Sequence, residues 1–239
     1  MCDHDEERMV DRRRLLTLAG LGLAATGLVL RATPVEAAGG EKTTLTPDKA
    51  LETLKAGNAR YVADAQACVA DLAKRRSSVA NHQAPWAVIV GCSDSRVLPE
   101  LLFGGLGPGE LFVARNAGNM VDTATMGTVE YGAEVLGAPL VVVLGHERCG
   151  AVVAACDVVT KKAKFPGSIG PMVNPIVPAA TAVRGRPGDF VDNAVRESAK
   201  RTAQRLATAS PILSRLVKDA KLKIVAARYD LNNGKVEYL

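Results

Sequence analysis

The chain has 239 residues with 30 basic and 25 acidic side chains, and 48% of its residues are hydrophobic. This composition excludes a disordered or low-complexity chain and supplies the apolar material for one sizeable core. The basic residues are scattered along the sequence, without the aromatic interleaving that is typical of nucleic-acid-binding surfaces. We therefore expect one globular domain with no nucleic-acid partner.

Residues 1–37 have the pattern of an export signal peptide. Arg12-Arg13-Arg14 precedes an uncharged stretch from Leu15 to Leu30, and the segment up to Ala37 offers a small-residue cleavage site. The uncharged stretch is shorter than the roughly 20 residues that span a bilayer, so no stable membrane span is expected after cleavage. The arginine run resembles a twin-arginine signal. The sequence thus predicts an exported protein, periplasmic or extracellular, with a domain at residues 38–239; an uncleaved anchor or an internal amphipathic helix is the alternative.

From residue 46 onward, helix and strand patterns alternate. Unbroken apolar runs are typical of parallel strands that are covered on both faces, and Asn233-Gly234 indicates a tight turn into a last strand. The sequence therefore predicts an α/β fold with a mainly parallel central sheet, an antiparallel edge strand and helices on both faces. The expected strands are 86–91, 111–115, 140–145, 222–229 and 235–239. Helices are expected after Thr46, Asp122, Cys149 and Asp189, with a loop at 165–171.

Two short polar motifs follow two of the apolar runs. Cys92-Ser-Asp94-Ser-Arg96 comes after the first run and His146-Glu-Arg-Cys149 after the second. In open α/β sheets, ligands and catalytic groups gather beyond the carboxyl ends of the strands. One imidazole and two thiols match a catalytic zinc ion, which takes three protein ligands and leaves a fourth position open.

Asp94 has two alternative roles in such a site. It can fill the fourth position on the metal, or it can pair with Arg96. Held by Arg96, Asp94 stays ionised and accepts a hydrogen bond from a zinc-bound hydroxide, which orients that nucleophile. Two simpler interpretations of the cysteines stay open: a disulfide between Cys92 and Cys149 in an exported protein, or buried free thiols.

Between residue 38 and the end of the chain, two cysteines and one histidine lie outside the motifs. Cys156 lies about 10 Å from Cys149 along a helix, too far to share the metal, and is expected to be a buried small residue. Cys68 is expected to be a lone thiol, with a Cys68–Cys156 disulfide as the alternative. His82 is expected at the surface without a role.

Residues 46–239 resemble the β-class carbonic anhydrases. The resemblance runs through Gln83-Ala-Pro-Trp86, Gly91-Cys-Ser-Asp-Ser-Arg-Val97, Pro108-Gly-Glu-Leu-Phe112, Arg115-Asn-Ala-Gly-Asn119, Glu130-Tyr131 and Gly145-His-Glu-Arg-Cys-Gly150. It implies one zinc ion per chain on Cys92, His146 and Cys149, with Asp94 and Arg96 as a partnered dyad. The implied activity is that of a zinc lyase, the reversible hydration of carbon dioxide to bicarbonate and a proton by a zinc-bound hydroxide.

The resemblance also implies pocket residues and an assembly. Gln83, Phe112 and Tyr131 match positions that line the substrate site in the plant-type branch of the family, and Gly150 is a further substrate-binding position. The branch with a regulatory bicarbonate site has a tryptophan where this chain has Ile89, so the plant-type branch is favoured. A homodimer or larger homo-oligomer is implied, with pockets near the subunit boundary. The alternatives are a carbon disulfide or carbonyl sulfide hydrolase on the same site, or a non-enzymatic exported zinc or thiol protein.

Overall fold

The computed structural model describes residues 41–65 and 72–239. The export signal predicted at residues 1–37 and the thiol of Cys68 lie outside these residues. The helices are α1 (Pro47–Ala63), α2 (Leu72–Ser78), α3 (Pro99–Leu102), α4 (Thr123–Glu130), α5 (Gly150–Lys161), α6 (Ile169–Val173), α7 (Val177–Val183), α8 (Phe190–Ala209) and α9 (Pro211–Lys218). The strands are β1 (Ala87–Cys92), β2 (Leu111–Asn116), β3 (Leu140–His146), β4 (Lys223–Tyr229) and β5 (Val236–Tyr238). A π-helical turn, η1 (Tyr131–Val135), follows α4, and a 3-10 turn, η2 (Asn174–Ile176), follows α6.

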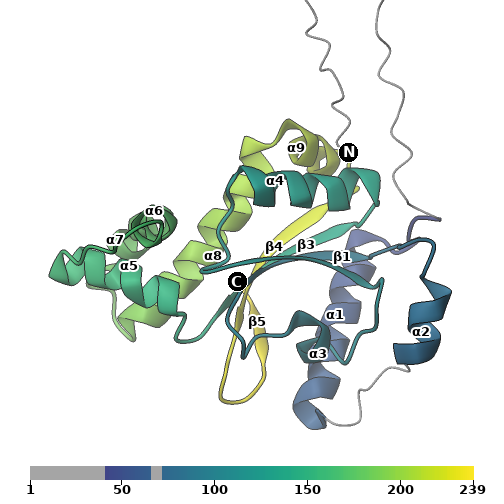
Figure 1. Cartoon of the computed structure of the whole chain (residues 1–239), viewed down its shortest axis with the longest axis horizontal. Helices are drawn as coiled ribbons and strands as arrows, with labels where there is room; N and C mark the ends of the chain where they lie inside the picture. The colour runs from purple at the N-terminus through teal and green to yellow at the C-terminus, as the bar shows by residue number, and fades with distance from the viewer. Residues whose placement is uncertain (1–40, 66–71) are drawn as a thin grey trace, which may run out of the picture. The chain divides into compact units, whose positions relative to one another are not determined.

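Within the described residues, five strands form one sheet in the order β2-β1-β3-β4-β5 (Figure 1). β1 pairs in parallel with β2 and β3, β3 pairs in parallel with β4, and β5 returns antiparallel along β4. β1 and β3 are buried along their whole length, as their unbroken apolar sequences predicted. The predicted α/β fold with an antiparallel edge strand is confirmed.

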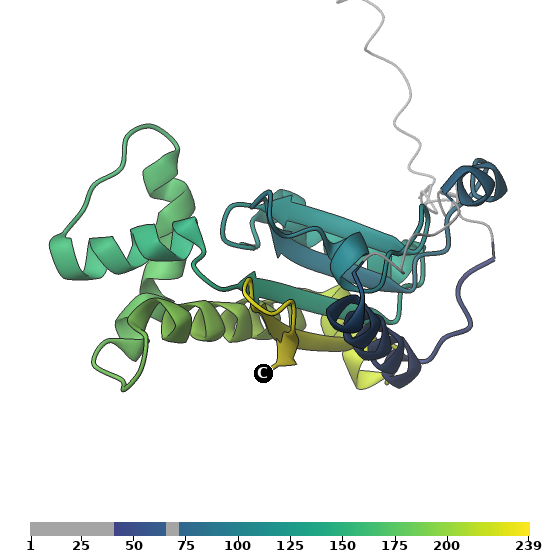
Figure 2. The ribbon, with the colours of Figure 1, turned by 90° about the horizontal axis from the view of Figure 1, so that it is seen from below.

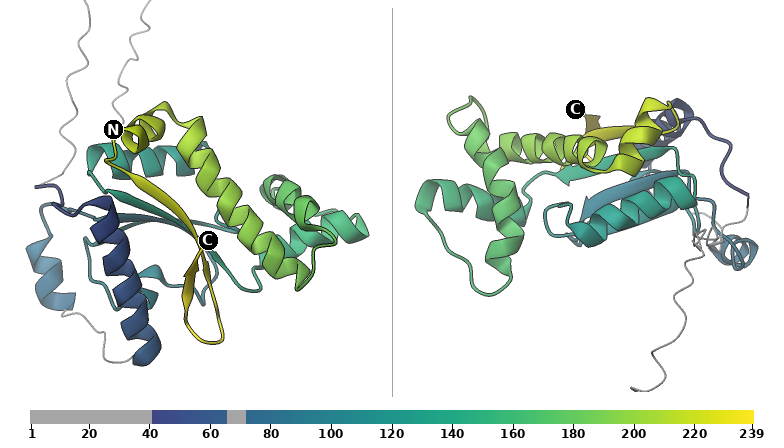
Figure 3. Two further views of the ribbon diagram at one scale, coloured as in Figure 1. Left: turned by 180° about the vertical axis from the view of Figure 1, so that it is seen from behind. Right: turned by 90° about the horizontal axis from the view of Figure 1, so that it is seen from above.

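Alternate side chains along the central strands enter two apolar cores, one on each face of the sheet. On β1, Val88 and Val90 join a core with α4, α8 and α9, whereas Ala87 and Ile89 join a core with α1 and α3. Seen from below, α1 and α3 overlie the strands (Figure 2), and seen from above α4, α8 and α9 do so (Figure 3). The prediction of helices on both faces is therefore confirmed.

A third apolar core lies beyond the carboxyl ends of the strands. There α5 and α7 pack against α8, and α6 packs against α5 (Figures 2 and 3). The buried side chains of this core include Val152, Ile176, Val183 and Val195, together with Cys92 and Cys149. The two cysteines of the sequence motifs thus lie where the sheet meets this helical group.

The predicted capping residues begin three of the helices. The side chains of Thr46, Asp122 and Asp189 each accept a hydrogen bond from the backbone N–H three residues later, at 3.3, 2.8 and 2.6 Å. Such bonds satisfy N–H groups that have no partner inside the helix. The predicted starts of α1, α4 and α8 are confirmed.

Several short helices were not predicted, among them α6 and α9. The segment 165–171 was expected to be a loop, but α6 begins at Ile169 because Met172 N–H bonds to the carbonyl of Ser168 and Val173 enters the third core. α9 follows α8 directly, since the Ser210 hydroxyl accepts a hydrogen bond from Leu213 N–H and Pro211 occupies the first turn.

Among the described residues, no helix combines the length and apolar character needed to cross a membrane.

The helix predicted after Asp122 ends in a π-helical turn. Leu136 N–H bonds to the carbonyl of Tyr131, five residues back. A Cβ atom at Gly132 would lie 2.7 Å from a methyl group of Val88 and 3.0 Å from the ring of Phe112. The turn therefore packs closely against β1 and β2 because glycine stands at this position.

Candidate metal centre

The structure brings Cys92, His146 and Cys149 together at the carboxyl end of the sheet. Cys92 is the last residue of β1 and His146 is the last residue of β3, and these strands are neighbours. Cys149 immediately precedes α5 and is its N-cap residue. All three side chains are buried. The strand order makes the two sequence motifs meet.

The distances between their side-chain atoms fit a tetrahedral metal ion. The sulfurs of Cys92 and Cys149 lie 3.9 Å apart, and one ligand atom from each of the three residues lies within 4.8 Å of the others. Two zinc–sulfur bonds of about 2.3 Å at a tetrahedral angle separate the sulfurs by about 3.8 Å. A disulfide requires about 2.05 Å, so the alternative of a Cys92–Cys149 disulfide does not hold in this structure.

The imidazole of His146 has one ring nitrogen available for a metal. Its Nδ1 lies 3.0 Å from the carbonyl oxygen of Glu147. Its Nε2 is buried and has no hydrogen-bond partner in the described part of the chain. A buried polar atom without a partner costs free energy, and a metal ion among the three side chains would remove this cost. A backbone carbonyl on the other nitrogen is a usual partner of metal-binding histidines.

The two thiols of the cluster ionise unequally. The pKa of Cys92 is lowered to about 4, chiefly by the neighbouring thiol of Cys149 and also by His146 and the Gly118 N–H, against the opposing effect of burial. The pKa of Cys149 is raised, because the thiolate of Cys92 and burial both disfavour a second negative charge. A divalent cation between the sulfurs would stabilise both thiolates. The chemistry of the three donors therefore fits a zinc ion.

Asp94 is paired with Arg96 beside the cluster. Its Oδ1 accepts from the backbone N–H of Arg96 at 3.0 Å and from Nε at 2.9 Å, and its Oδ2 accepts from Nη2 at 2.7 Å. These bonds hold the pKa of Asp94 well below its usual range, so the carboxylate is ionised at neutral pH. Oδ2 also lies 3.8 Å from Nε2 of His146. Of the two roles expected for Asp94, the structure has the arginine-paired one.

The loop that carries the other two donors is held by the β4–β5 hairpin. The carboxylate of Glu147 accepts two bonds from the side-chain amide of Asn232, at 3.1 and 2.9 Å. Arg148 has a left-handed backbone conformation, with φ of +52°, which is uncommon outside glycine and often marks functional sites. Glu147 and Arg148 occupy the two positions between His146 and Cys149. The sequence motif gave no sign of the Asn232 contact, because that residue follows 85 positions later.

Three of the predicted pocket residues lie apart from the cluster within one chain. Phe112 pairs with the β1 residue four positions before Cys92, a separation of about 13 Å along the strand. The rings of Phe112 and Tyr131 are neighbours, with centroids 6.0 Å apart, and Gln83 precedes β1 at the same end of the sheet. Gly150, by contrast, begins α5 next to the cluster, with open space where a Cβ atom would stand.

The remaining described cysteine and histidine take no part in the cluster. Cys156 is a buried free thiol on α5, as predicted, and burial raises its pKa to about 11. His82 is exposed, as expected.

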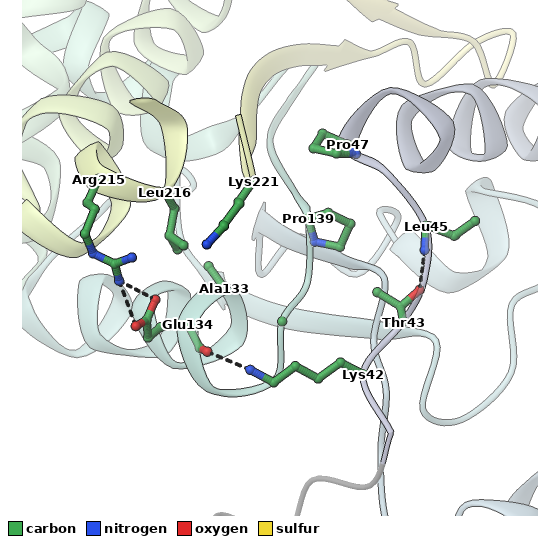
Figure 4. Close-up of a pocket in the computed structure, with 11 residues that line it drawn as sticks. Lys42, Thr43, Leu45, Pro47, Ala133, Glu134, Pro139, Arg215, Leu216 and Lys221 are labelled. Carbon is green, nitrogen blue, oxygen red and sulfur yellow. Dashed lines mark hydrogen bonds and ion pairs between the residues drawn. The ribbon is translucent and has the colours of Figure 1, made fainter. Parts of the chain in front are cut away.

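One pocket lies at the amino ends of β3 and β4, away from the cluster. Its volume is about 460 Å³, and Lys42, Glu134, Arg215 and Lys221 are its charged lining residues (Figure 4). The carboxylate of Glu134 is held by Arg215 at 2.7 Å, and Lys42 donates to the backbone carbonyl of Glu134 at 3.2 Å. Most of these polar groups are therefore engaged with one another, and we assign the pocket no role.

Comparisons with known proteins agree on one family. Residues 87–236 match the family described as carbonic anhydrase. A carbonic anhydrase from Mycolicibacterium smegmatis is 36% identical over 191 residues, which are 80% of this chain and 92% of that protein. The solved structure of a Coccomyxa β-carbonic anhydrase in complex with acetazolamide has 28% identity and a TM-score of 0.61, and the match covers 73% of this chain and 81% of that one. A tetrameric β-carbonic anhydrase from Sordaria macrospora has a TM-score of 0.62 at 22% identity, covering 79% and 95% of the two chains, which shows likeness of fold.

Proposed function

This chain belongs to the β-class carbonic anhydrase family, and we propose that it catalyses the reversible hydration of carbon dioxide with one zinc ion held by Cys92, His146 and Cys149. The observation that carries the proposal is the buried cluster itself. Two sulfurs stand 3.9 Å apart beside a histidine nitrogen that has no partner among the described residues. No other group of at least three metal-binding side chains occurs in the part of the chain that the structure describes.

Asp94 and Arg96 have the arrangement that the reaction needs. Zinc, when bound, lowers the pKa of water and supplies a nucleophile near neutral pH. The ionised carboxylate of Asp94, 3.8 Å from His146 Nε2, is a hydrogen-bond acceptor for that nucleophile and orients it. Arg96 keeps the carboxylate charged and in place through three hydrogen bonds. One water adds to carbon dioxide, giving bicarbonate and a proton that passes to solvent.

The position of the pocket residues supports a homodimer. Phe112 lies about 13 Å along the strand from its own metal cluster, and the ring of Tyr131 neighbours that of Phe112, so the two rings line a site only if another copy provides it. β2 is an edge strand, and an edge strand has free backbone groups that favour pairing with another chain. Tyr131 is 38% exposed beside it. We propose that the Gln83, Phe112 and Tyr131 side chains of one copy line the carbon dioxide site of the other.

We further propose that residues 1–37 direct export by the twin-arginine route, on the strength of the arginine run and the short uncharged stretch that follows it. An aliphatic residue, Ile89, stands where the bicarbonate-regulated branch has tryptophan, and this supports placement in the plant-type branch.

The test combines metal analysis with stopped-flow hydration of carbon dioxide on the purified protein. We expect one zinc ion per chain, and rapid hydration that a strong chelator abolishes and added zinc restores. Zinc binding without hydration would favour a non-enzymatic zinc protein. Hydrolysis of carbon disulfide or carbonyl sulfide without carbon dioxide hydration would favour the sulfur-substrate alternative.

A further inference from the structure

The loop after β1 must place two different groups within reach of one metal position. Cys92 and Asp94 are two residues apart, and the sulfur of Cys92 lies in the buried cluster while the carboxylate of Asp94 lies beside it. A small shift of the Asp94 backbone toward the cluster would bring the carboxylate onto the metal. A shift away would remove it from the nucleophile. The loop backbone therefore needs a support that acts on Asp94 itself.

Arg115, on the neighbouring strand β2, makes contacts that provide this support. Its Nε donates to the carbonyl oxygen of Cys92 at 2.8 Å, and its Nη2 donates to the carbonyl oxygen of Asp94 at 2.7 Å. One planar guanidinium thus bridges the two residues whose side chains serve the site. Among residues 41–65 and 72–239, no carboxylate forms an ion pair with Arg115. Within the described residues, the side-chain hydrogen bonds of Arg115 go to the last residue of β1 and to the loop that follows it.

The register of β1 and β2 explains why the arginine reaches both carbonyls. Cys92 pairs with Asn116 and Gly91 pairs with Arg115, so Arg115 lies beside the point where β1 ends. The backbone N–H of Ser93 donates to the carbonyl of Asn116 at 3.0 Å, which keeps the loop next to β2 as it leaves the sheet. Beyond that point, Arg115 is the β2 side chain that holds Asp94.

We propose that Arg115 is a positioning residue that fixes the Asp94 backbone, so that the carboxylate stays with Arg96 and leaves the fourth metal position open. The inference rests on the proposed function, since it assigns a role within the same site. This role differs from that of Arg96, which forms hydrogen bonds to the carboxylate of Asp94. Arg115 forms a hydrogen bond to the backbone carbonyl of Asp94 instead.

Lysine is an informative replacement at this position. Its single ammonium group has no planar fork, so it can retain the charge while spanning the two carbonyls poorly. A role of Arg115 in charge alone predicts that Arg115→Lys behaves like the wild type. A bridging role predicts that Arg115→Lys is impaired nearly as much as Arg115→Ala.

The experiment compares Arg115→Ala, Arg115→Lys, Arg96→Ala and the double variant Arg96→Ala/Arg115→Ala in the full-length protein. Arg201→Ala is the matched control, because Arg201 is an exposed arginine on α8 that pairs with Glu197 at 2.8 Å. Metal content, kcat and KM are measured on the zinc forms. The absorption spectrum of the cobalt(II) forms reports whether a further ligand occupies the metal, independently of turnover.

We expect Arg115→Ala to keep its metal and to lose about ten- to hundredfold in kcat with little change in KM. Its cobalt spectrum should change in the same direction as that of Arg96→Ala. Because both arginines would act through Asp94, the double variant should be no slower than Arg96→Ala. The control should match the wild type.

Several outcomes would overturn the proposal: additive losses in the double variant, an unchanged cobalt spectrum, or wild-type kcat in Arg115→Lys. If Arg115→Ala does not fold, the comparison of Arg115→Lys with the wild type decides. Loss of metal from Arg115→Lys would show that Arg115 supports the metal donors and not Asp94. If the wild type does not hydrate carbon dioxide, the proposed function fails, while the cobalt spectra still decide whether Arg115 positions Asp94.

Discussion

Oδ2 of Asp94 lies 3.8 Å from Nε2 of His146, although both oxygens of the same carboxylate accept hydrogen bonds from Arg96. The carboxylate therefore stands between two partners, an arginine that holds it and a metal position that attracts it. Its distance from the histidine nitrogen is short enough that losing the arginine would allow it to become a fourth ligand. An occupied fourth position leaves no place for the nucleophile.

Replacing Arg96 should therefore affect turnover more than metal binding. We expect Arg96→Ala to retain close to one zinc ion per chain and to lose about ten- to hundredfold in kcat, because the Arg96 side chain is not a metal donor but forms hydrogen bonds to Asp94. Metal analysis and stopped-flow kinetics on the same preparation measure both quantities. Near-normal turnover would contradict the dyad, and loss of zinc would show that Arg96 is structural.

Replacing a metal donor should remove zinc and activity together. A serine hydroxyl is a far poorer zinc ligand than a thiolate at neutral pH, so Cys149→Ser should lose most of its zinc and more than about 100-fold in kcat/KM. Cys156→Ser is the matched control, because Cys156 is also a buried free thiol and lies on α5, the helix that Cys149 caps, but outside the cluster. A Cys149→Ser protein with full zinc content and full activity would refute the assignment.

The sequence predicted the parts of this site that depend on local pattern. Apolar runs located β1 and β3, and parallel strands place Cys92 and His146 at the same edge of the sheet. The residues that hold the loops were not predicted, because their contacts depend on strand register and on distant segments. Arg115 lay inside a motif of the resemblance without a role, and Asn232 lay outside every motif.

The π-helical turn was missed for a different reason. The π-turn lies at the end of the helix, so few apolar positions follow it, and Val129 and Ala133 still enter the same core. The motifs also did not predict that Phe112 lies apart from Cys92 within one chain. A motif records which residues are present, and not how far apart they lie in the fold.

The cap of α4 should make stability depend on pH. The bond from Thr125 N–H lowers the pKa of Asp122 in the folded state. Its stabilising charge is therefore present above the unfolded pKa of about 3.9 and is lost as the pH falls through the lower folded-state pKa. We expect Asp122→Ala to destabilise the protein by about 1 kcal/mol at pH 7, with the difference narrowing below about pH 4. Urea unfolding from about pH 3 to about pH 7 measures this.

Asp122→Asn is the control for that experiment. Asparagine caps helices well without a titrating charge, so its stability relative to Asp122→Ala should stay constant over the same pH range. A constant difference between the wild type and Asp122→Ala would show that the carboxylate charge contributes nothing.

Export should depend on the paired arginines at the start of the chain. We expect replacement of Arg12 and Arg13 by lysine to leave the protein in the cytoplasm, because twin-arginine signals are recognised through the arginines and not through positive charge alone. Cell fractionation followed by immunoblotting measures the distribution. Replacement of Arg8, which lies outside the arginine run, serves as the control, and unchanged export of the Arg12/Arg13 variant would contradict the twin-arginine route.

A mixing experiment can decide whether Tyr131 serves its own cluster or that of a second copy. Tyr131→Ala removes an exposed ring of the proposed pocket wall but leaves the metal donors intact. Cys149→Ser destroys the cluster but leaves the wall intact. If the wall acts across the subunit boundary, a mixed dimer contains one site with both an intact cluster and an intact wall.

We therefore expect two impaired proteins to regain activity when they are unfolded together and refolded. Random pairing makes half of the dimers mixed, each with one complete site of two, so the rate should reach about one quarter of the wild-type value. Cys149→Ser mixed with Asp94→Asn is the control and should regain nothing, because both changes damage the same half of a site. If the activity of the mixture of Tyr131→Ala and Cys149→Ser also stays at the average of the two separate activities, Tyr131 lines the site of its own subunit. The separation of about 13 Å along the strand between Phe112 and the cluster would then have to close by movement within one chain. The packing of η1 against β1 and β2 at Gly132 opposes such a movement.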